Sequence, residues 1–284
     1  MKTIYHFSGA GNDFVVIDGR EGEVSAFREV PRIEALCQEY KTDGLMILGQ
    51  EMPGQAGHDV MADPDRPSVD FTMEFYNPDG SSGMMCGNGG RCIVAFADYL
   101  GIKPASGGVF LFMAPDGLHT GEILERPGGS TGSPTDRWIV RIKMIDVQGI
   151  TPMLGGYFLN TGTRHFVKFV DDVEQVDVDA EGKALRWDPA FAPIGTNVNF
   201  VHVAPDGLHV RTFEKGVEGE TLACGTGLTA CALVAHHAGV PTSTPGAYRL
   251  RARQDWLSVD FTPGADEKFT DVYLTGPARL VEIH

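Results

Sequence analysis

The sequence lacks any apolar run near the ~20 residues that a membrane-spanning helix needs, and it has only five cysteines, with no Cys-x-x-Cys pair. A disulfide framework and a zinc or thioredoxin-type redox site are therefore disfavoured. Positive charge is scarce too, because 23 Lys and Arg stand against 38 Asp and Glu, for a formal net charge of -15. Such a surface repels phosphate backbones and anionic lipids, so neither a nucleic-acid partner nor a membrane partner is expected.

What remains is the composition of an ordinary globular protein. The 284 residues are 42% hydrophobic and 21% charged, with a mean hydropathy of -0.10. This length is about 1.9 times the usual domain size of ~150 residues, which predicts one large domain or two modest ones. The first six residues lack the apolar run of a secretion signal, so we expect a cytoplasmic protein.

Short β-rich runs dominate the coarse secondary-structure prediction. They lie at 14–17, 45–48 and 69–75, and turn signals follow at 77–80 and 205–207. The stretch 126–137 is rich in Gly, Ser and Pro, so it is either a domain linker or a long hairpin loop, and its place near the midpoint favours the linker. Residues 51–67 look like a surface insertion with no assignable role.

Two segments repeat the same pattern in the two halves of the chain. Cys86-Gly87-Asn88-Gly89 opens one and Cys224-Gly225-Thr226-Gly227 opens the other. Each runs 15 residues, through an almost wholly apolar interior, to a glycine that a proline soon follows (Gly101 and Pro104; Gly239 and Pro241). This predicts two equivalent buried helices. A fainter similarity between 11–15 and 163–167 supports an internal duplication.

A cysteine followed by glycine at a helix start is suited to anion chemistry. The unpaired N–H groups and the positive end of the helix dipole stabilise a bound carboxylate or the cysteine thiolate itself. A cysteine inside an apolar helix is usually a small core residue, and this interpretation is favoured for Cys37, Cys92 and Cys231. For Cys86 and Cys224 the glycine-flanked position favours a reactive thiol.

Two such thiols facing one cleft could invert a stereocentre without a cofactor, because one thiolate removes a proton from carbon while the opposite thiol delivers one. Other chemistries find less support. No Lys-Ser/Thr follows Gly225-Thr226-Gly227 as a P-loop requires, the scattered Gly-x-Gly pairs are too weak for a dinucleotide fold, and no tight metal-ligand spacing occurs.

Three stretches together resemble the signatures of diaminopimelate epimerases: 9–18, 76–92 and 214–227. The resemblance implies a pyridoxal-phosphate-independent isomerase that interconverts LL- and meso-diaminopimelate for lysine and peptidoglycan. It also implies an α+β fold of two pseudo-symmetric domains, each a curved mixed sheet wrapped around a central buried helix. The domains would be 1–131, completed by 276–284, and 132–275. Family members tend to be dimeric, so a homodimer is expected.

The same resemblance assigns roles to individual residues. Cys86 and Cys224 would be the acid/base thiols, and His165 and Glu214 would help to ionise or orient them. The substrate would be bound by Asn12, Asn77, Gly87, Asn88, Thr163, Asn197, Lys215, Gly225 and Thr226, with the backbone N–H groups of the two helix starts holding the α-carboxylate. Two thiols that flank one carbon should also form a disulfide when the empty site is oxidised.

Each of these assignments has a structural alternative. Asn77 could be a turn residue, His165 a hydrogen-bonded sheet histidine, and Glu214 with Lys215 a solvated pair.

The chain also departs from the family pattern, which usually has Asp-Gln, Asn-Pro-His and Glu-Arg where this sequence has Asp43-Gly44, Thr163-Arg164-His165 and Glu214-Lys215. Lys cannot reproduce the bidentate clamp of Arg on a carboxylate, although Arg164 could supply another cation. Two rival functions therefore stay open: a racemase or isomerase of another amino acid on the same scaffold, and a non-catalytic dicarboxylate-binding module.

Overall fold

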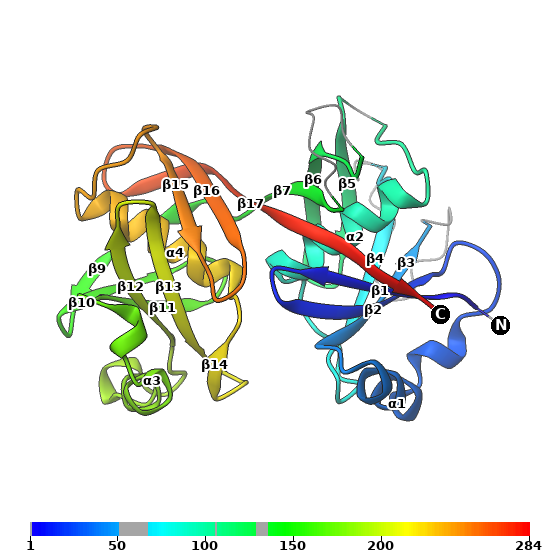
Figure 1. Cartoon of the computed structure of the whole chain (residues 1–284), viewed down its shortest axis with the longest axis horizontal. Coiled ribbons are helices and arrows are strands. Elements are labelled where there is room, and N and C mark those ends of the chain that lie inside the picture. The colour runs from blue at the N-terminus through cyan, green and yellow to red at the C-terminus, as the bar shows by residue number, and fades with distance from the viewer. Residues whose placement is uncertain (1, 51–67, 106, 129–135) are drawn as a thin grey trace. The chain divides into compact units, whose positions relative to one another are not determined.

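The structure is a computed structural model that describes residues 2–50, 68–105, 107–128 and 136–284 (Figure 1). The chain forms two compact units: unit 1 is Met1–Ile142 with Ala278–His284, and unit 2 is Lys143–Pro277. The expected insertion at 51–67 lies outside the described residues. Within the described part of the chain, no helix has both the length and the apolar character needed to cross a membrane.

The described residues of unit 1 form a mixed sheet with two α-helices. Its elements in chain order are β1 (Ile4–Gly9), β2 (Asn12–Asp18), a 3-10 turn (Ser25–Arg28), α1 (Val30–Tyr40), β3 (Gly44–Gly49), β4 (Phe71–Tyr76), α2 (Gly87–Tyr99), β5 (Val109–Ala114), β6 (Gly117–Glu125) and β7 (Trp138–Lys143). The final residues of β17 (Lys268–Ile283) pair antiparallel with β1 and complete this sheet.

Unit 2 repeats this plan. Its elements are β8 (Val147–Gln148), β9 (Thr151–Met153), β10 (Gly156–Asn160), β11 (Arg164–Phe169), 3-10 turns (Val173–Gln175, Pro189–Phe191), α3 (Val178–Arg186), β12 (Asn197–Ala204), β13 (Gly207–Glu214), β14 (Gly219–Thr221), α4 (Gly225–His237), β15 (Ala247–Arg251), β16 (Trp256–Pro263) and the first part of β17.

Strand pairing follows the same order in the two units. In unit 1, β1–β2 is antiparallel, β2–β3 parallel, β3–β4 antiparallel, β4–β5 parallel and β5–β6 antiparallel. In unit 2, β10–β11, β11–β12, β12–β13, β13–β15 and β15–β16 repeat these directions in turn. A helix lies between the two strands of every parallel pair, because parallel strands need a long crossover. This matched order supports an internal duplication.

The central helices α2 and α4 carry the twinned cysteine motifs. Each is 13 residues long, each follows its cysteine directly, and Figure 1 shows each lying against the strands of its own unit. Eleven residues of α2, 87–97, are buried without a gap, which explains its nearly continuous apolar sequence. Gly101 and Gly239 follow the C-cap residues of the two helices and adopt φ values of +76° and +72°, so the predicted helix stops are confirmed.

The outer helices cover the opposite face of each sheet. In unit 1, Ile33, Leu36 and Cys37 of α1 pack with alternate residues of β2 and β3, including Val15 and Leu45. In unit 2 a corresponding cluster joins α3 to β11, β12 and β13. Because β2 and β3 are buried on both faces, residues 14–17 and 45–48 are apolar without alternation.

The Gly- and Pro-rich stretch 126–137 connects two strands of one sheet. β6 and β7 flank it and pair antiparallel, with Glu125 opposite Ile139, and unit 1 continues to Ile142. The flanking strands therefore support the hairpin-loop alternative rather than the favoured domain linker, while residues 129–135 lie outside the described part.

Candidate active site

Cys86 caps the N-terminus of α2 and remains partly exposed. Its backbone is extended, with φ -102° and ψ 152°, and its Sγ accepts a hydrogen bond of 3.2 Å from the backbone N–H of Gly89. A sulfur that accepts an N–H at a helix start is favoured in its thiolate form, because both the donor and the dipole stabilise negative charge.

A buried arginine holds the first turn of α2 in place. The Arg91 side chain donates to the carbonyl of Gly87 at 3.0 Å and to Oδ1 of Asn88 at 2.7 Å. The amide of Asn88 in turn donates to Oδ1 of Asn12 at the start of β2. The structure thus brings the predicted residues Asn12 and Asn88 together at this helix start.

Asn77 lies in the turn that follows β4. Its carbonyl accepts from Gly80 at 2.9 Å, and its side chain donates to Oγ of Ser81 at 3.0 Å. These contacts are those of the turn-residue alternative, and a role for Asn77 in binding a substrate stays a prediction.

Cys224 caps α4 in the corresponding place in unit 2, and only 7% of its surface is exposed. Its Sγ lies 3.5 Å from Oγ1 of Thr226. That hydroxyl lies 2.9 Å from Nε2 of His165 and 3.2 Å from Oγ1 of Thr163. The predicted residues Thr163, His165 and Thr226 therefore form one hydrogen-bonded cluster beside Cys224.

His165 is completely buried on β11, and burial lowers its pKa to about 3. Its ring is therefore neutral at pH 7. Nδ1 lies 3.1 Å from the amide nitrogen of Asn199 and Nε2 lies 2.9 Å from Oγ1 of Thr163. Both ring nitrogens have partners, as in the sheet-histidine alternative, yet the Thr226 hydroxyl contacts both the ring and Cys224 Sγ.

The remaining predicted residues of unit 2 lie at the ends of β12 and β13. Asn197 donates to the carbonyl of Arg164 at 3.0 Å and accepts from the backbone N–H of Lys215 at 2.8 Å. Glu214 accepts from Oγ1 of Thr221 at 3.0 Å, whereas Lys215 is exposed.

Two departures from the family pattern have local structural reasons. A Cβ at Gly44 would lie 2.7 Å from the carbonyl oxygen of Tyr76, so the packing of β3 against β4 requires glycine there. The Arg164 guanidinium donates to the carbonyl of Phe191 at 3.2 Å and lies 5.0 Å from the ring centroid of Phe158. It is therefore engaged inside unit 2, and the expectation that Arg164 compensates for Lys215 finds no support.

The other three cysteines are buried, as predicted. Cys92 and Cys231 have no exposed surface, and burial raises the pKa of both thiols. Cys37 lies on the buried face of α1, where burial likewise raises the pKa of its thiol. We therefore expect these thiols to be unreactive.

Sequence analysis missed three polar residues that support the helix starts: Arg91, Asn199 and Thr212. All three are buried, and Asn199 and Thr212 continue the hydrogen-bonded cluster behind His165. A charged residue inside an otherwise apolar helix was a usable signal for Arg91. Nothing in the local sequence distinguishes Asn199 or Thr212 from other strand residues, because their role arises from pairing between β12 and β13.

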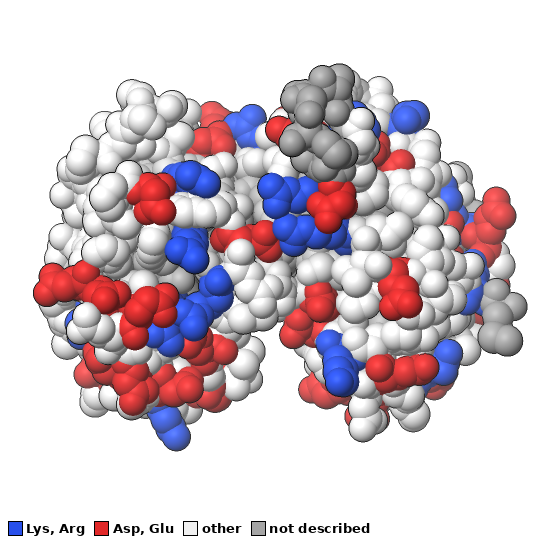
Figure 2. Space-filling model, viewed as in Figure 1, with Lys and Arg blue, Asp and Glu red and all other residues white. Residues whose placement is uncertain are grey.

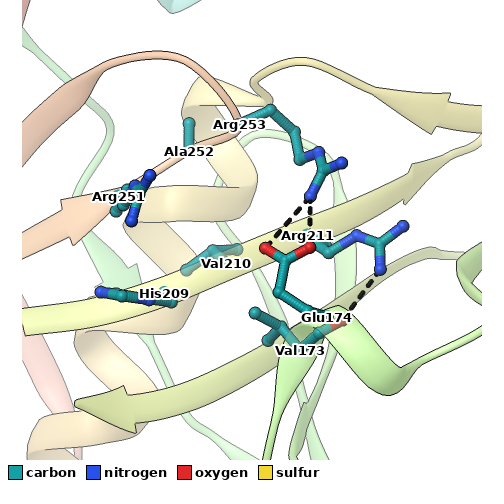
Figure 3. Close-up of a pocket in the computed structure, with 8 residues that line it drawn as sticks. All are labelled: Val173, Glu174, His209, Val210, Arg211, Arg251, Ala252 and Arg253. Atoms are coloured by element: carbon teal, nitrogen blue, oxygen red, sulfur yellow. Dashed lines mark hydrogen bonds and ion pairs between the residues drawn. The ribbon is translucent and has the colours of Figure 1, made fainter.

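A separate shallow pocket on unit 2 contains none of the predicted site residues (Figure 3). Two of its arginines, Arg211 and Arg253, already bind Glu220 and Glu174 respectively. Across the described residues, no group of three or more His, Cys, Asp and Glu side chains could hold a metal ion.

Comparison with known proteins identifies the family. The family model described as "Diaminopimelate epimerase" matches residues 4–106 and 157–281. The chain belongs to the diaminopimelate epimerase family. The diaminopimelate epimerase of Chlorobaculum tepidum is 36% identical over 283 residues, covering 96% of this chain and 97% of the relative. That of Aquifex aeolicus is 38% identical over 287 residues, covering 98% and 95%. The resemblance is confirmed, and with it the class of enzyme, an isomerase.

Solved structures with little sequence similarity share the fold. A Bacillus anthracis phenazine biosynthesis protein of the PhzF family matches with a TM-score of 0.72 at 10% identity, covering 100% of this chain and 98% of that one. A hydroxyproline epimerase from Agrobacterium vitis matches with a TM-score of 0.62 at 14% identity, covering 100% and 91%. The predicted fold class of the diaminopimelate epimerase family is therefore confirmed.

Proposed function

We propose that this chain interconverts LL- and meso-2,6-diaminopimelate without pyridoxal phosphate, by a two-base thiol mechanism. The observation that carries the proposal is the repeated placement of a cysteine as the N-cap of a central buried helix, once in each unit. Family membership supplies the substrate, because the curated relatives are named for it.

In the proposed reaction one sulfur is a thiolate and the other is a thiol. The thiolate takes the α-hydrogen as a proton, so that the C–H bond breaks and an S–H bond forms. The opposite thiol then gives its proton to the other face of the carbon and becomes the thiolate. The two sulfurs must therefore lie on opposite sides of the α-carbon, and the enzyme alternates between two protonation states.

Negative charge spreads toward the α-carboxylate when the proton leaves. The first N–H groups of a helix have no intrahelical acceptors, so those of Gly87, Asn88, Gly225 and Thr226 are the proposed donors to that carboxylate. Fixed donors in a water-poor site stabilise such charge more than water does. We place Glu214 beside this chemistry as a helper of the thiols. Asn12, Asn77, Asn197 and Lys215 are the proposed ligands for the polar groups of the substrate.

The proposal also covers the location, oligomeric state and partners of the enzyme. We place it in the cytoplasm as a homodimer that binds no nucleic acid. Acidic side chains gather over the region of α3 on the face shown in Figure 2, in line with the net charge of -15. Light scattering of the purified protein tests the dimer.

The decisive experiment is α-proton exchange in deuterated water, with the reduced enzyme and a panel of amino acids. We expect exchange with the diaminopimelates alone. Cys86→Ser and Cys224→Ser should each slow exchange by about 10²–10⁴-fold, the usual contribution of a positioned acid or base. Full exchange by either variant would refute the mechanism. Binding that survives both changes, with no exchange by the parent enzyme, would instead indicate a dicarboxylate-binding module.

A second candidate is epimerisation of another amino acid. The specific observation behind it is the replacement of the family's Asn by Thr163, whose hydroxyl is bonded within the His165 cluster. Exchange of a different amino acid in the same panel would favour this candidate.

Oxidation of the empty enzyme is an independent check of the geometry. With no substrate between them, two sulfurs that share one site form a disulfide when their Cβ atoms come within about 3.5–4.5 Å of each other. We expect peptide mapping to find Cys86 linked to Cys224, and failure to crosslink under any oxidising condition would argue against a shared site.

A further inference from the structure

The hydrogen-bonded cluster of unit 2 continues behind His165 to residues that no family assignment covers. Asn199 of β12 has no exposed surface, and its amide nitrogen donates to the carbonyl of Phe166 at 3.1 Å. Its Oδ1 accepts from Oγ1 of Thr212 at 3.0 Å. Because a carbonyl can only accept a hydrogen bond, the Asn199 amide group has one permitted orientation, with nitrogen toward Phe166.

That orientation determines the tautomer of His165. The second hydrogen of the Asn199 amide points to Nδ1 of His165, which lies 3.1 Å away and must accept it. A neutral imidazole that accepts at Nδ1 carries its proton on Nε2. The ring is neutral because burial lowers its pKa to about 3.

The protonated Nε2 then determines the direction of the remaining bonds. Its single hydrogen is shared between the hydroxyl oxygens of Thr163 and Thr226, each 2.9 Å from Nε2, so neither hydroxyl can donate to this nitrogen. The hydroxyl hydrogen of Thr226 is left with two acceptors, Thr163 at 3.2 Å and Cys224 Sγ at 3.5 Å. An ionised sulfur is the stronger acceptor, since charge-assisted hydrogen bonds are about twice as strong as neutral ones.

We propose that Asn199 is a positioning residue that turns His165 and Thr226 into a one-way chain of donors ending on Cys224 Sγ, which favours the thiolate of this sulfur. The inference rests on the proposed function, because it gives Cys224 the role of resident base. The chain runs from Thr212 through Asn199, His165 and Thr226 to the sulfur, and every step donates toward it.

Gly227 shows that this arrangement is closely packed. A Cβ at that position would overlap Oδ1 of Asn199 and would lie 3.3 Å from both Cys224 Cβ and His165 Cε1. Glycine therefore lets β11, β12 and the start of α4 approach closely enough for the chain to form.

The test measures how much of Cys224 is present as thiolate, with no substrate in the sample. Iodoacetamide reacts with thiolates, so peptide mass spectrometry at pH 7 gives the alkylation rate of each cysteine. We expect Thr226→Val to slow alkylation of Cys224 about tenfold, equivalent to about 1.4 kcal/mol, while Cys86 changes less than about twofold. Thr226→Ser keeps the hydroxyl and should restore the rate.

Thr229→Val is the matched control. Thr229 is another buried threonine of α4, and its hydroxyl donates to the carbonyl of Gly225 at 3.0 Å rather than to the sulfur. It should leave alkylation of Cys224 at the parental rate. Alkylation of Cys224 in Thr226→Val at the parental rate would overturn the proposal, and so would equal slowing by Thr229→Val.

A second measurement uses the unaltered protein. Nitrogen-15 NMR of the histidine rings, with His165 assigned from the signal that His165→Gln loses, should show the proton on Nε2. A proton on Nδ1 would overturn the proposed chain of donors, whatever alkylation rates the variants show. Neither readout uses diaminopimelate. If the parent enzyme exchanges diaminopimelate normally but Thr226→Val is alkylated at the parental rate, only the chain of donors is refuted. If alkylation changes as expected but the parent enzyme exchanges no diaminopimelate, only the substrate assignment is refuted.

Discussion

Replacing Gly227 by alanine tests how tightly the start of α4 packs against β12. Gly227 is the third residue of α4, and the added Cβ would overlap Oδ1 of Asn199. That oxygen has little room to move, because Thr212 donates to it at 3.0 Å and the same side chain is bonded to Phe166. Either the helix start shifts or the Asn199 amide loses its partners.

The expected cost follows from three contributions. Overpacking of a buried position costs about 1–3 kcal/mol, and a buried polar group left without a partner costs about 1–3 kcal/mol. Alanine is the better helix former by at most about 1 kcal/mol, which offsets part of this. We therefore expect Gly227→Ala to lower the free energy of unfolding by about 1–5 kcal/mol.

Gly89→Ala is the matched control, because Gly89 is the third residue of α2. A Cβ there would meet its nearest neighbours, Cys86 Sγ and Met46 Sδ, at 3.4 and 3.5 Å, which is ordinary contact. Urea unfolding, followed by circular dichroism, should show Gly89→Ala at least as stable as the parent. The reasoning is refuted if Gly227→Ala is as stable as the parent, or if Gly227→Ala and Gly89→Ala lose the same free energy of unfolding.

Three further predictions concern other buried groups. Arg91→Leu removes the donors to Gly87 and Asn88, so a loss of about 1.5–3 kcal/mol is expected in urea unfolding, and an unchanged midpoint would show that the guanidinium does not hold the helix start. The folded-state pKa of His165, about 3, lies below its unfolded value of about 6.5, so between these values the unfolded chain binds a proton that the folded protein does not. The free energy of unfolding should therefore fall as the pH is lowered through this window, by up to about 1.4 kcal/mol per pH unit. If His165→Gln leaves the slope of stability against pH unchanged between about pH 5.5 and 7, this assignment is contradicted. In the native protein iodoacetamide should label Cys86 and spare Cys92 and Cys231, which have no exposed surface; labelling of either core cysteine at the Cys86 rate would show that these helices open readily.

Much of the fold could be predicted from local sequence. The runs at 14–17 and 45–48 lie within β2 and β3, and 69–75 overlaps β4. The central helices begin directly after Cys86 and Cys224, where both halves of the sequence have glycine followed by an apolar run. They end just before Gly101 and Gly239, which take positive φ. These features depend on residues close together in the chain, so pattern and propensity suffice.

The stretch 126–137 and Asn77 show where local patterns stop. A long Gly- and Pro-rich segment suits a linker and a hairpin loop equally, and only the pairing of β6 with β7 supports the hairpin. Asn77 fits both a turn and a substrate ligand, and its bond to Ser81 belongs to the turn. The resemblance supplied Asn12, Asn88, His165 and Thr226 as site residues, but it did not predict that Arg91 or Asn199 would support them.

The amino-acid sequence by itself determined which residues are apolar, where the two cysteine-capped helices start and stop, and to which family the chain belongs. Those properties follow from residue type and short-range spacing. Tertiary structure decided the tautomer of His165, the direction of the bonds toward Cys224 and the need for glycine at 227. Each depends on atoms of β11, β12 and the start of α4, which are far apart in the chain, meeting within 3.5 Å, and no local pattern encodes that distance.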